Sequence, residues 1–397
     1  MPLCLRCFLS CTVVAALAAS TPHKVSDAEV ASVQRSAILI DTHNDVTSDT
    51  VDGLDIGKRR TTGHTDLERL RDGGVGATFF AAFVDAKYVK TNQAAHRTLE
   101  MIDTIRHDIA ARYPDRVRLA LTANDIEAAH REGKFAALIG IEGGHAIEDS
   151  LRLLRDYYAL GVRYMTLTHS NTNNWADSSG DINNPDVVHH NGLTPFGRDV
   201  VREMNRLGMM VDISHVADKT FRDVLEVSTA PPFASHSSCR AVSNVPRNMT
   251  DEMIVALAKK GGVVDVNFAC EFLSQKSADA GMPFMKRIMT APGEAERKAL
   301  LEEYSKVMVR ATLDDAVAHI DHIVKIAGIG AVGIGSDFDG VGCTPIGLDD
   351  VSKYPRLTRA LLERGYSADD VRRIYGGNVL RVMRAVEAES ARLRAAK

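Results

Sequence analysis

The stretch ILIDTHND, residues 38–45, joins an apolar run to a cluster of polar side chains. Its apolar part, with Ala37 before it, has the composition of a strand that is buried on both faces. His43 and Asp45 follow two residues apart, so in an extended backbone their side chains lie on the same side. Such a pair can bind one cation, although Asp and Asn are also common in turns. By itself this stretch leaves a metal site and a polar turn both open.

The composition is that of an ordinary globular protein. The chain has 397 residues, of which 45% are hydrophobic and 25% are charged. This length provides a large core, and single barrel domains of this size are common. The net charge of −4 gives no electrostatic basis for binding nucleic acid or an anionic membrane surface.

The first twenty residues have the features of a secretory signal peptide. Arg6 precedes an apolar run over residues 11–19, and small residues stand at Ala16, Ala18 and Ser20. We therefore expect a signal peptide over residues 1–20, one catalytic domain over residues 21–397, and a secreted or periplasmic protein. An apolar N-terminal helix is the alternative. No other segment approaches the ~20 apolar residues that span a bilayer, so no transmembrane segment is expected.

Three cysteines lie outside the expected signal peptide, at positions 239, 270 and 343. Because three is an odd number, at least one of them is free or pairs between chains. The spacing contains no CxxC zinc pair. The chain is therefore not a small scaffold held together by disulfides.

Eight apolar, strand-like segments alternate with longer amphipathic segments. This alternation predicts an α/β fold, a (β/α)8 TIM-type barrel. A doubly wound sheet is the alternative, but no nucleotide-binding fingerprint follows the first strand. After the first strand, the others are expected at Gly76–Val84, Phe135–Glu142, Arg163–His169, Met209–His215, Phe233–His236, Gly262–Phe268 and Ala331–Asp337, with a small extra strand at Val117–Leu121. Inserts are expected at Asp49–Asp72, Asn171–Asn191 and Glu271–Glu294.

Histidine or carboxylate side chains stand at the carboxyl ends of six of these eight strands. They are His43 and Asp45, Glu142, His169, His215, His236 and Asp337. In barrel enzymes the carboxyl ends of the strands form the face that carries the active site. Neutral imidazoles and carboxylates suit zinc and similar divalent metals. The set is too large for one catalytic zinc and about right for two metals that share a carboxylate and a hydroxide, with a further carboxylate to move protons.

The other histidines have simpler interpretations. His145, close behind Glu142, is expected behind the ligands or at the surface, and His189 and His190 are expected in a solvated insert. Six more are expected at the surface: His64, His96, His107, His130, His319 and His322.

Eight short motifs also occur in an order that is typical of one family. They are DTHND (41–45), EGGHAI (142–147), LTHSNTNNWADSS (167–179), VDISHV (211–216), SHSSCRAV (235–242), PRNM (246–249), GIGSDFDG (333–340) and GLDDVSKYP (347–355). Over residues 39–387 the chain resembles the renal, or membrane, dipeptidase family of zinc metallopeptidases. The resemblance implies an amidohydrolase-like barrel, dipeptide substrates, two zinc ions per subunit and a homodimer.

The resemblance also implies which residues bind the metals. His43 and Asp45 bind the first zinc, and Glu142 bridges the two ions. His215 and His236 bind the second zinc.

The same resemblance implies that three further residues act on the substrate. His169 contacts the substrate and steadies the oxyanion of the tetrahedral intermediate. Arg247 binds the free carboxylate of the dipeptide, a role that suits the forked guanidinium. Asp337 accepts the proton of the bridging water and passes it to the leaving amine. Where mammalian members carry a tyrosine near the substrate, this chain has Ala269, which leaves the side-chain preference open.

Two other functions remain open from the residues alone. One is a related metal-dependent amide or lactone hydrolase. Against it, many such relatives have His-x-His in the first strand and a carboxylated lysine as bridge, whereas this chain has His43-x-Asp45 and Glu142. The other is a non-catalytic envelope protein that binds metal or peptide, which the intact ligand set with Asp337 argues against.

Overall fold

The computed structural model describes residues 24–291 and 293–396, so the expected signal peptide lies outside the described residues. The strands are β1 (Leu39–Asn44), β2 (Val75–Phe83), β3 (Val117–Leu119), β4 (Phe135–Glu142), β5 (Val162–Thr166), β6 (Met210–Asp212), β7 (Ala234–Ser237), β8 (Val264–Val266) and β9 (Val332–Ile334). They pair in parallel in the order β6-β5-β4-β2-β1-β9-β8-β7, with β3 beside the start of β4.

The ends of this sheet meet between β6 and β7. The amide of Ile213 donates to the carbonyl of Phe233 (2.9 Å), and the amide of Phe233 donates to the carbonyl of Val211 (3.1 Å). The eight main strands therefore form a nearly closed barrel, with β3 outside it. This confirms the predicted (β/α)8 fold, including the small extra strand.

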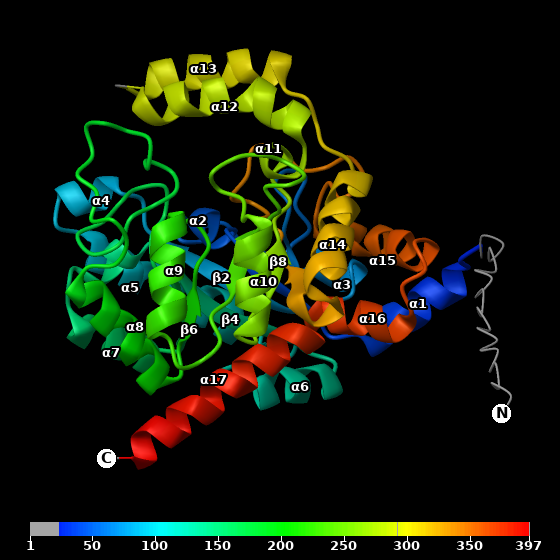
Figure 1. Cartoon of the computed structure of the whole chain (residues 1–397). Helices are drawn as coiled ribbons and strands as arrows, with labels where there is room; N and C mark the ends of the chain where they lie inside the picture. The colour runs from blue at the N-terminus through cyan, green and yellow to red at the C-terminus, as the bar shows by residue number, and fades with distance from the viewer. Residues whose placement is uncertain (1–23, 292, 397) are drawn as a thin grey trace, which may run out of the picture.

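Helices follow the strands and surround the barrel (Figure 1). They are α1 (Asp27–Ser36), α2 (Thr47–Thr50), α3 (Leu67–Asp72), α4 (Lys87–Lys90), α5 (Ala94–Thr104), α6 (Ala123–Arg131), α7 (Leu151–Ala159), α8 (Pro195–Leu207), α9 (Asp218–Val227), α10 (Asp251–Lys259), α11 (Cys270–Leu273), α12 (Gln275–Thr290), α13 (Glu294–Val307), α14 (Leu313–Ala327), α15 (Tyr354–Glu363), α16 (Ala368–Arg372) and α17 (Asn378–Ala395). Short 3-10 or π segments are η1 (Ile105–Ala111), η2 (Gly144–Ile147), η3 (Ile329–Ala331), η4 (Val351–Lys353) and η5 (Arg373–Gly377). Within the described residues, none of these helices has both the length and the apolar character to cross a membrane.

The interior of the barrel is filled by large side chains below the level of the predicted site. The ring of Tyr164 packs 5.1 Å from that of Phe79 and 5.4 Å from that of Phe233. Gly140 makes room for it, because a Cβ atom at that position would lie 2.0 Å from Cζ of Tyr164. Helix α17 covers the lower end of the barrel (Figure 1) and adds Met383 to the same apolar cluster. The opposite end, where the strands finish, is left for polar residues.

Several predicted strands end earlier than the sequence indicates, and three of them carry predicted site residues. His169, His215 and Asp337 each lie three residues beyond the end of their strand. His215 has φ 66° and Asp337 has φ 64°, a left-handed backbone conformation that cannot continue a strand. These three side chains therefore stand on the first turns of the loops that follow their strands, whereas His43, Glu142 and His236 lie within strands.

One predicted surface histidine is buried. His319 lies on α14, where its Nδ1 accepts the amide of Cys239 (2.9 Å) and its Nε2 bonds to the carbonyl of Leu273 (3.0 Å). Its position relative to Ala316 and Ile320 has the helical period of the buried face, so the pattern of α14 already contained this signal. His189 and His190 are half-buried, not fully solvated.

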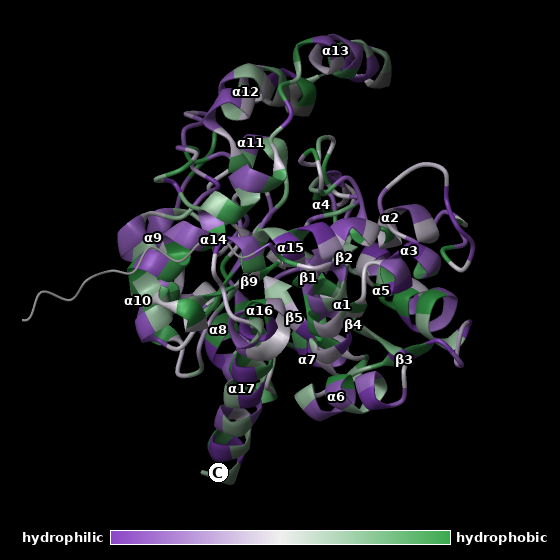
Figure 2. Cartoon of the chain, turned by 90° about the vertical axis from the view of Figure 1, so that its right-hand side faces the viewer, coloured by the Kyte–Doolittle hydropathy of each residue, from purple (hydrophilic) through white to green (hydrophobic). Residues whose placement is uncertain are grey.

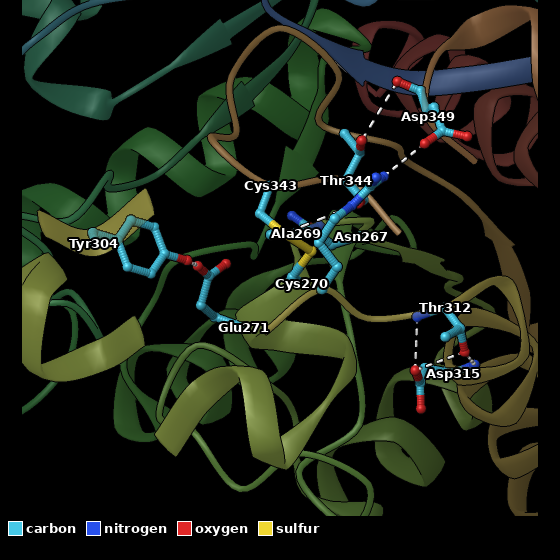
Figure 3. Close-up of a disulfide and its surroundings, with 11 residues drawn as sticks. Asn267, Ala269, Cys270, Glu271, Tyr304, Thr312, Asp315, Cys343, Thr344 and Asp349 are labelled. Carbon is cyan, nitrogen blue, oxygen red and sulfur yellow. Dashed lines mark hydrogen bonds and ion pairs between the residues drawn. A yellow bond between two sulfur atoms is a disulfide. The ribbon is translucent and has the colours of Figure 1, made fainter. Parts of the chain in front are cut away.

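The insert after β8 is helical and stands apart from the barrel. Helices α12 and α13 project beyond the carboxyl ends of the strands (Figures 1 and 2) and share a small apolar cluster around Tyr304. A disulfide between Cys270 and Cys343 joins the start of the insert to the loop that follows β9 (Figure 3). Cys239 is free and buried, in agreement with the odd number of cysteines.

Candidate metal centre and active site

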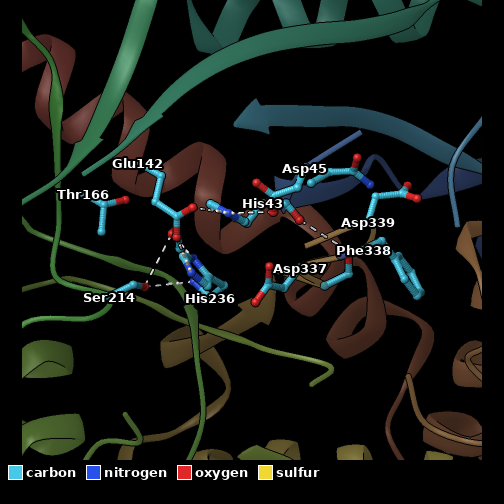
Figure 4. A network of polar contacts seen from close by, with 12 residues as sticks. His43, Asp45, Glu142, Thr166, Ser214, His236, Asp337, Phe338 and Asp339 are labelled. Carbon is cyan, nitrogen blue, oxygen red and sulfur yellow. Dashed lines mark hydrogen bonds and ion pairs between the residues drawn. The ribbon is translucent and has the colours of Figure 1, made fainter. Parts of the chain in front are cut away.

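Glu142, the last residue of β4, lies at the centre of a cluster of histidines (Figure 4). Its Oε1 lies 3.0 Å from Nε2 of His215 and 3.2 Å from Nε2 of His236. Its other oxygen, Oε2, lies 3.5 Å from Nε2 of His43. The two oxygens of one carboxylate thus face different imidazoles, and the rings of His43 and His236 are stacked with their centroids 3.7 Å apart.

A second group of possible ligands lies on the side of His43. Its Nε2 is 3.1 Å from Oδ2 of Asp45, and both side chains are buried. Neither atom is in hydrogen-bonding geometry with any group of residues 24–291 and 293–396. Buried polar atoms without a partner are rare because each costs about 1–3 kcal/mol. A cation between these atoms would satisfy both.

The described residues contain three overlapping groups whose ligand atoms lie within 4.8 Å of one another. The groups are His43, Glu142 and His236; Glu142, His169 and His215; and His43, Asp45 and Asp337. The structure therefore brings together all seven of the strand-end residues that the sequence singles out. Proximity alone does not separate metal ligands from residues that contact the substrate.

The electrostatics of the cluster suit divalent metals. Burial lowers the pKa values of His215 and His236 well below the ordinary value, so both rings are neutral and have a lone pair to share. Burial alone would raise the pKa of Glu142, but its interaction with the imidazole of His43 contributes to holding that pKa well below its usual range. Neutral rings at His215 and His236 beside an ionised Glu142 form a donor set that zinc accepts. Burial alone would lower the pKa of His43, but Tyr164 and the carboxylates of Glu142 and Asp45 raise it well above its ordinary value.

Residues inside the barrel orient two of the histidines. Nδ1 of His43 lies 2.8 Å from the hydroxyl of Tyr164, the ring that packs over Gly140. Nδ1 of His236 lies 2.7 Å from Oγ of Ser235, which donates to Asp212 (2.6 Å). Hydrogen bonds of this kind fix the ring orientation and tautomer of metal-binding histidines.

A glycine lets the chain turn directly after the central carboxylate. Gly143 has φ 102°, and a Cβ atom there would lie 2.6 Å from Cε1 of His145. His145 itself is buried, and its Nε2 bonds to the carbonyl of Val84 at 2.7 Å. It lies behind the cluster, one of the two places that the sequence predicts.

His169 and Asp337 are more exposed than the buried residues below them. The ring of His169 lies 4.6 Å from that of His215 and 4.8 Å from that of Phe83, and burial lowers its pKa. Asn267 donates from Nδ2 to Oδ2 of Asp337 at 2.8 Å. Burial raises the pKa of Asp337 well above its usual range. These two side chains form part of the rim of the site.

Arg247 completes the rim on the side of β7. Its Nη1 donates to Oγ of Ser237 and its Nη2 to the carbonyl of His236, both at 2.6 Å. A guanidinium has five N–H donors, and Nε of Arg247 is buried without a partner among the described residues. Burial lowers its pKa to about 10, so it remains a cation at neutral pH with donors left for an anion.

The match to known proteins covers almost the whole described chain. Residues 27–397 match the family model described as Membrane dipeptidase (Peptidase family M19). The chain belongs to this family. It is 39% identical to Dipeptidase verJ of Clonostachys rogersoniana over 376 residues, which cover 90% of this chain and 86% of that protein. Membership confirms the predicted resemblance and makes the protein a metallo-dipeptidase, a hydrolase of peptide bonds.

Solved structures of dipeptidases share the fold. The probable dipeptidase PvdM from Pseudomonas aeruginosa has a TM-score of 0.80 and 25% identity, covering 91% of this chain and 98% of that one. A metallo peptidase from Rhodobacter sphaeroides, solved with a phosphinate mimic of the dipeptide L-Ala-D-Ala, has a TM-score of 0.73 and 26% identity, covering 88% of this chain and 99% of that one.

Three residues of this dipeptidase site were missed from the sequence. Tyr164 lies inside β5, and Asp212, the last residue of β6, falls inside the longer strand that the sequence predicts, so both have the pattern of ordinary strand positions. Asn267 directly follows β8, so it carries the same strand-end signal as the histidines and carboxylates. Its side chain is an amide, which does not belong to the imidazole and carboxylate pattern that marks the other strand ends.

Proposed function

We propose that this metallo-dipeptidase holds two zinc ions bridged by Glu142 and hydrolyses the peptide bond of dipeptides. His43 and Asp45 would hold the first ion, and His215 and His236 the second. The observation that carries the proposal is the division of the Glu142 carboxylate, with Oε1 toward one pair of histidines and Oε2 toward His43. The unpartnered atoms of His43 and Asp45 fit the same donor set.

The metals and Asp337 divide the chemistry between them. When bound, two zinc ions activate a water as a nucleophile near neutral pH and polarise the scissile carbonyl. Asp337 is then the group that takes the proton of the water and returns it to the leaving amine. Its hydrogen bond from Asn267 fixes the carboxylate at the rim, beside the ligands His43 and Asp45.

His169 supplies a hydrogen bond to the developing oxyanion. Because burial lowers its pKa, the ring is neutral and carries one N–H that it can donate. A donor that is fixed before the reaction stabilises the charge without reorganisation. The edge contact with Phe83 limits the orientations of the ring.

Arg247 favours substrates with a free carboxylate close to the scissile bond. Its uncommitted N–H donors can bind a carboxylate in the two-pronged geometry that guanidinium favours. In a dipeptide the C-terminal carboxylate lies one residue from the scissile bond, within reach of a rim residue. In a longer peptide only the last peptide bond keeps this spacing, so at any other bond the contact is lost.

A panel of peptides tests the proposal. We expect hydrolysis of dipeptides, much slower hydrolysis of tripeptides and of dipeptide amides, and complete loss after chelation. Both L,L and L,D dipeptides belong in the panel, because the Rhodobacter sphaeroides relative was solved with an L-Ala-D-Ala mimic. Equal rates on dipeptides and dipeptide amides would contradict the role of Arg247.

We also propose that the protein is exported and forms a homodimer. The disulfide between Cys270 and Cys343 supports export, since such bonds persist in oxidising compartments. N-terminal sequencing of protein recovered from outside the cytoplasm would show a start near residue 21.

The proposal of a homodimer rests on the family resemblance alone, and a molar mass from light scattering tests it.

A further inference from the structure

Helix α11, at the start of the insert, lies beside the guanidinium of Arg247. The ring centroid of Phe272 is 5.5 Å from Cζ of Arg247, a distance at which a cation and an aromatic face attract each other. The opposite side of the guanidinium is bound to the barrel through Ser237 and the carbonyl of His236. Arg247 is thus held between β7 and the insert.

The backbone around Phe272 is tied to the loop that carries Arg247. Asn248, the next residue, donates from Nδ2 to the carbonyl of Phe272 at 2.8 Å. The hydroxyl of Ser243, in the same loop, donates to the carbonyl of Glu271 at 3.0 Å. The loop and α11 therefore keep a fixed distance, which a contact through one flexible side chain could not provide.

Two further contacts anchor α11 from the other side (Figure 3). The disulfide between Cys270 and Cys343 joins its first residue to the loop after β9, the strand that precedes Asp337. Glu271 points toward Tyr304 of α13, whose hydroxyl donates to its carboxylate. The position of the Phe272 ring is thus set by the barrel and by the rest of the insert together.

We propose that Phe272 is a positioning residue for dipeptide recognition, holding the guanidinium of Arg247 so that its free donors meet the substrate carboxylate. This inference rests on the proposed role of Arg247. A long side chain that is held in one geometry loses less conformational freedom when the substrate binds. The insert after β8 then contributes to substrate binding through Phe272 without touching the reacting atoms.

Phe272→Leu tests the proposal, because leucine keeps apolar volume and removes the aromatic face. For a dipeptide we expect KM to rise by about threefold to tenfold, the factor that one such contact is worth, with kcat nearly unchanged. Hydrolysis of the corresponding dipeptide amide, which lacks the carboxylate, should not change. Phe272→Tyr, which restores the aromatic face, should restore the KM of the wild type.

Two further variants make the result interpretable. Phe284→Leu changes another aromatic residue of the insert, one that packs against Tyr304, and should leave both substrates unaffected. Arg247→Met should raise KM far more for the dipeptide than for the amide, because only the dipeptide loses a contact to its carboxylate. If Arg247→Met has this selective effect and Phe272→Leu does not, the positioning role is wrong and the proposed function stands. If Arg247→Met affects both substrates equally, the carboxylate role of Arg247 is itself wrong.

Discussion

The Nε2 atoms of His215 and His236 lie 2.9 Å apart, and both face Oε1 of Glu142. In neutral imidazoles these atoms can share only one proton between them, whereas a divalent cation can accept a lone pair from each ring and from the carboxylate. A bound divalent cation would therefore explain why two neutral histidines from different strands lie against one glutamate at the end of the barrel.

Replacement of Glu142 tests its place between the metals. We expect Glu142→Gln to lose bound metal and peptidase activity together, with metal affinity reduced by more than about 100-fold, the upper end of the effect of residues that only support ligands. Metal analysis after dialysis measures this. Glu132→Gln, at an exposed position, is the matched control and should keep both properties. A Glu142→Gln protein with full metal content would contradict the bridge.

Asp337→Asn should separate metal binding from turnover. The amide cannot accept a proton, so we expect kcat to fall by roughly 10²–10⁴-fold, the typical contribution of a general base or acid. Metal content should remain that of the wild type, although Asp337 lies within reach of His43 and Asp45. Loss of a metal from the variant would show that Asp337 is itself a metal ligand. A fully active variant would show that Asp337 does not transfer the proton.

The barrel and the centre of the site could be predicted because both leave local signals in the sequence. Apolar runs of strand length predict the eight strands, and polar residues at their carboxyl ends predict which side chains meet. The place of Arg247 at the rim of the site could not be predicted in this way. Arg247 lies in a loop, and the position of its guanidinium depends on contacts with β7 and α11. Pairing of Cys270 with Cys343 depends on the fold as well, because 73 residues separate them.

The burial of His319 makes stability depend on pH. Burial lowers its pKa from 6.5 to about 4, so between these values the unfolded chain binds a proton that the folded protein does not. Stability should therefore fall as the pH drops from about 6.5 to 4, by up to about 3 kcal/mol from this residue. His319→Gln should be less stable at pH 7, because its hydrogen bonds are disturbed, but should lose less stability on acidification.

Urea unfolding at pH 7 and at pH 4.5 measures this difference. Ile320→Val is the control, because Ile320 is buried on the same helix and carries no ionisable group. It should show the pH dependence of the wild type. An equal loss of stability in wild type and His319→Gln would mean that His319 is not the residue that titrates.

The disulfide should contribute to stability through the long loop that it closes. For a sequence separation of 73 the chain-entropy model gives about 4 kcal/mol. Cys343→Ser should unfold at lower urea concentration by a corresponding amount, and reductant should bring the wild type to the same midpoint. The variant itself should not respond to reductant. A wild-type midpoint that reductant leaves unchanged would show that the bond between Cys270 and Cys343 does not contribute.

Titration of metal-depleted protein with zinc tests the central claim most directly. Bound zinc and the rate of dipeptide hydrolysis are measured together at each addition. The account predicts that two zinc ions bind per chain and that full activity returns only as the second site fills. Binding of a single ion at full activity, or hydrolysis by the metal-free protein, would contradict a centre in which Glu142 joins two metals.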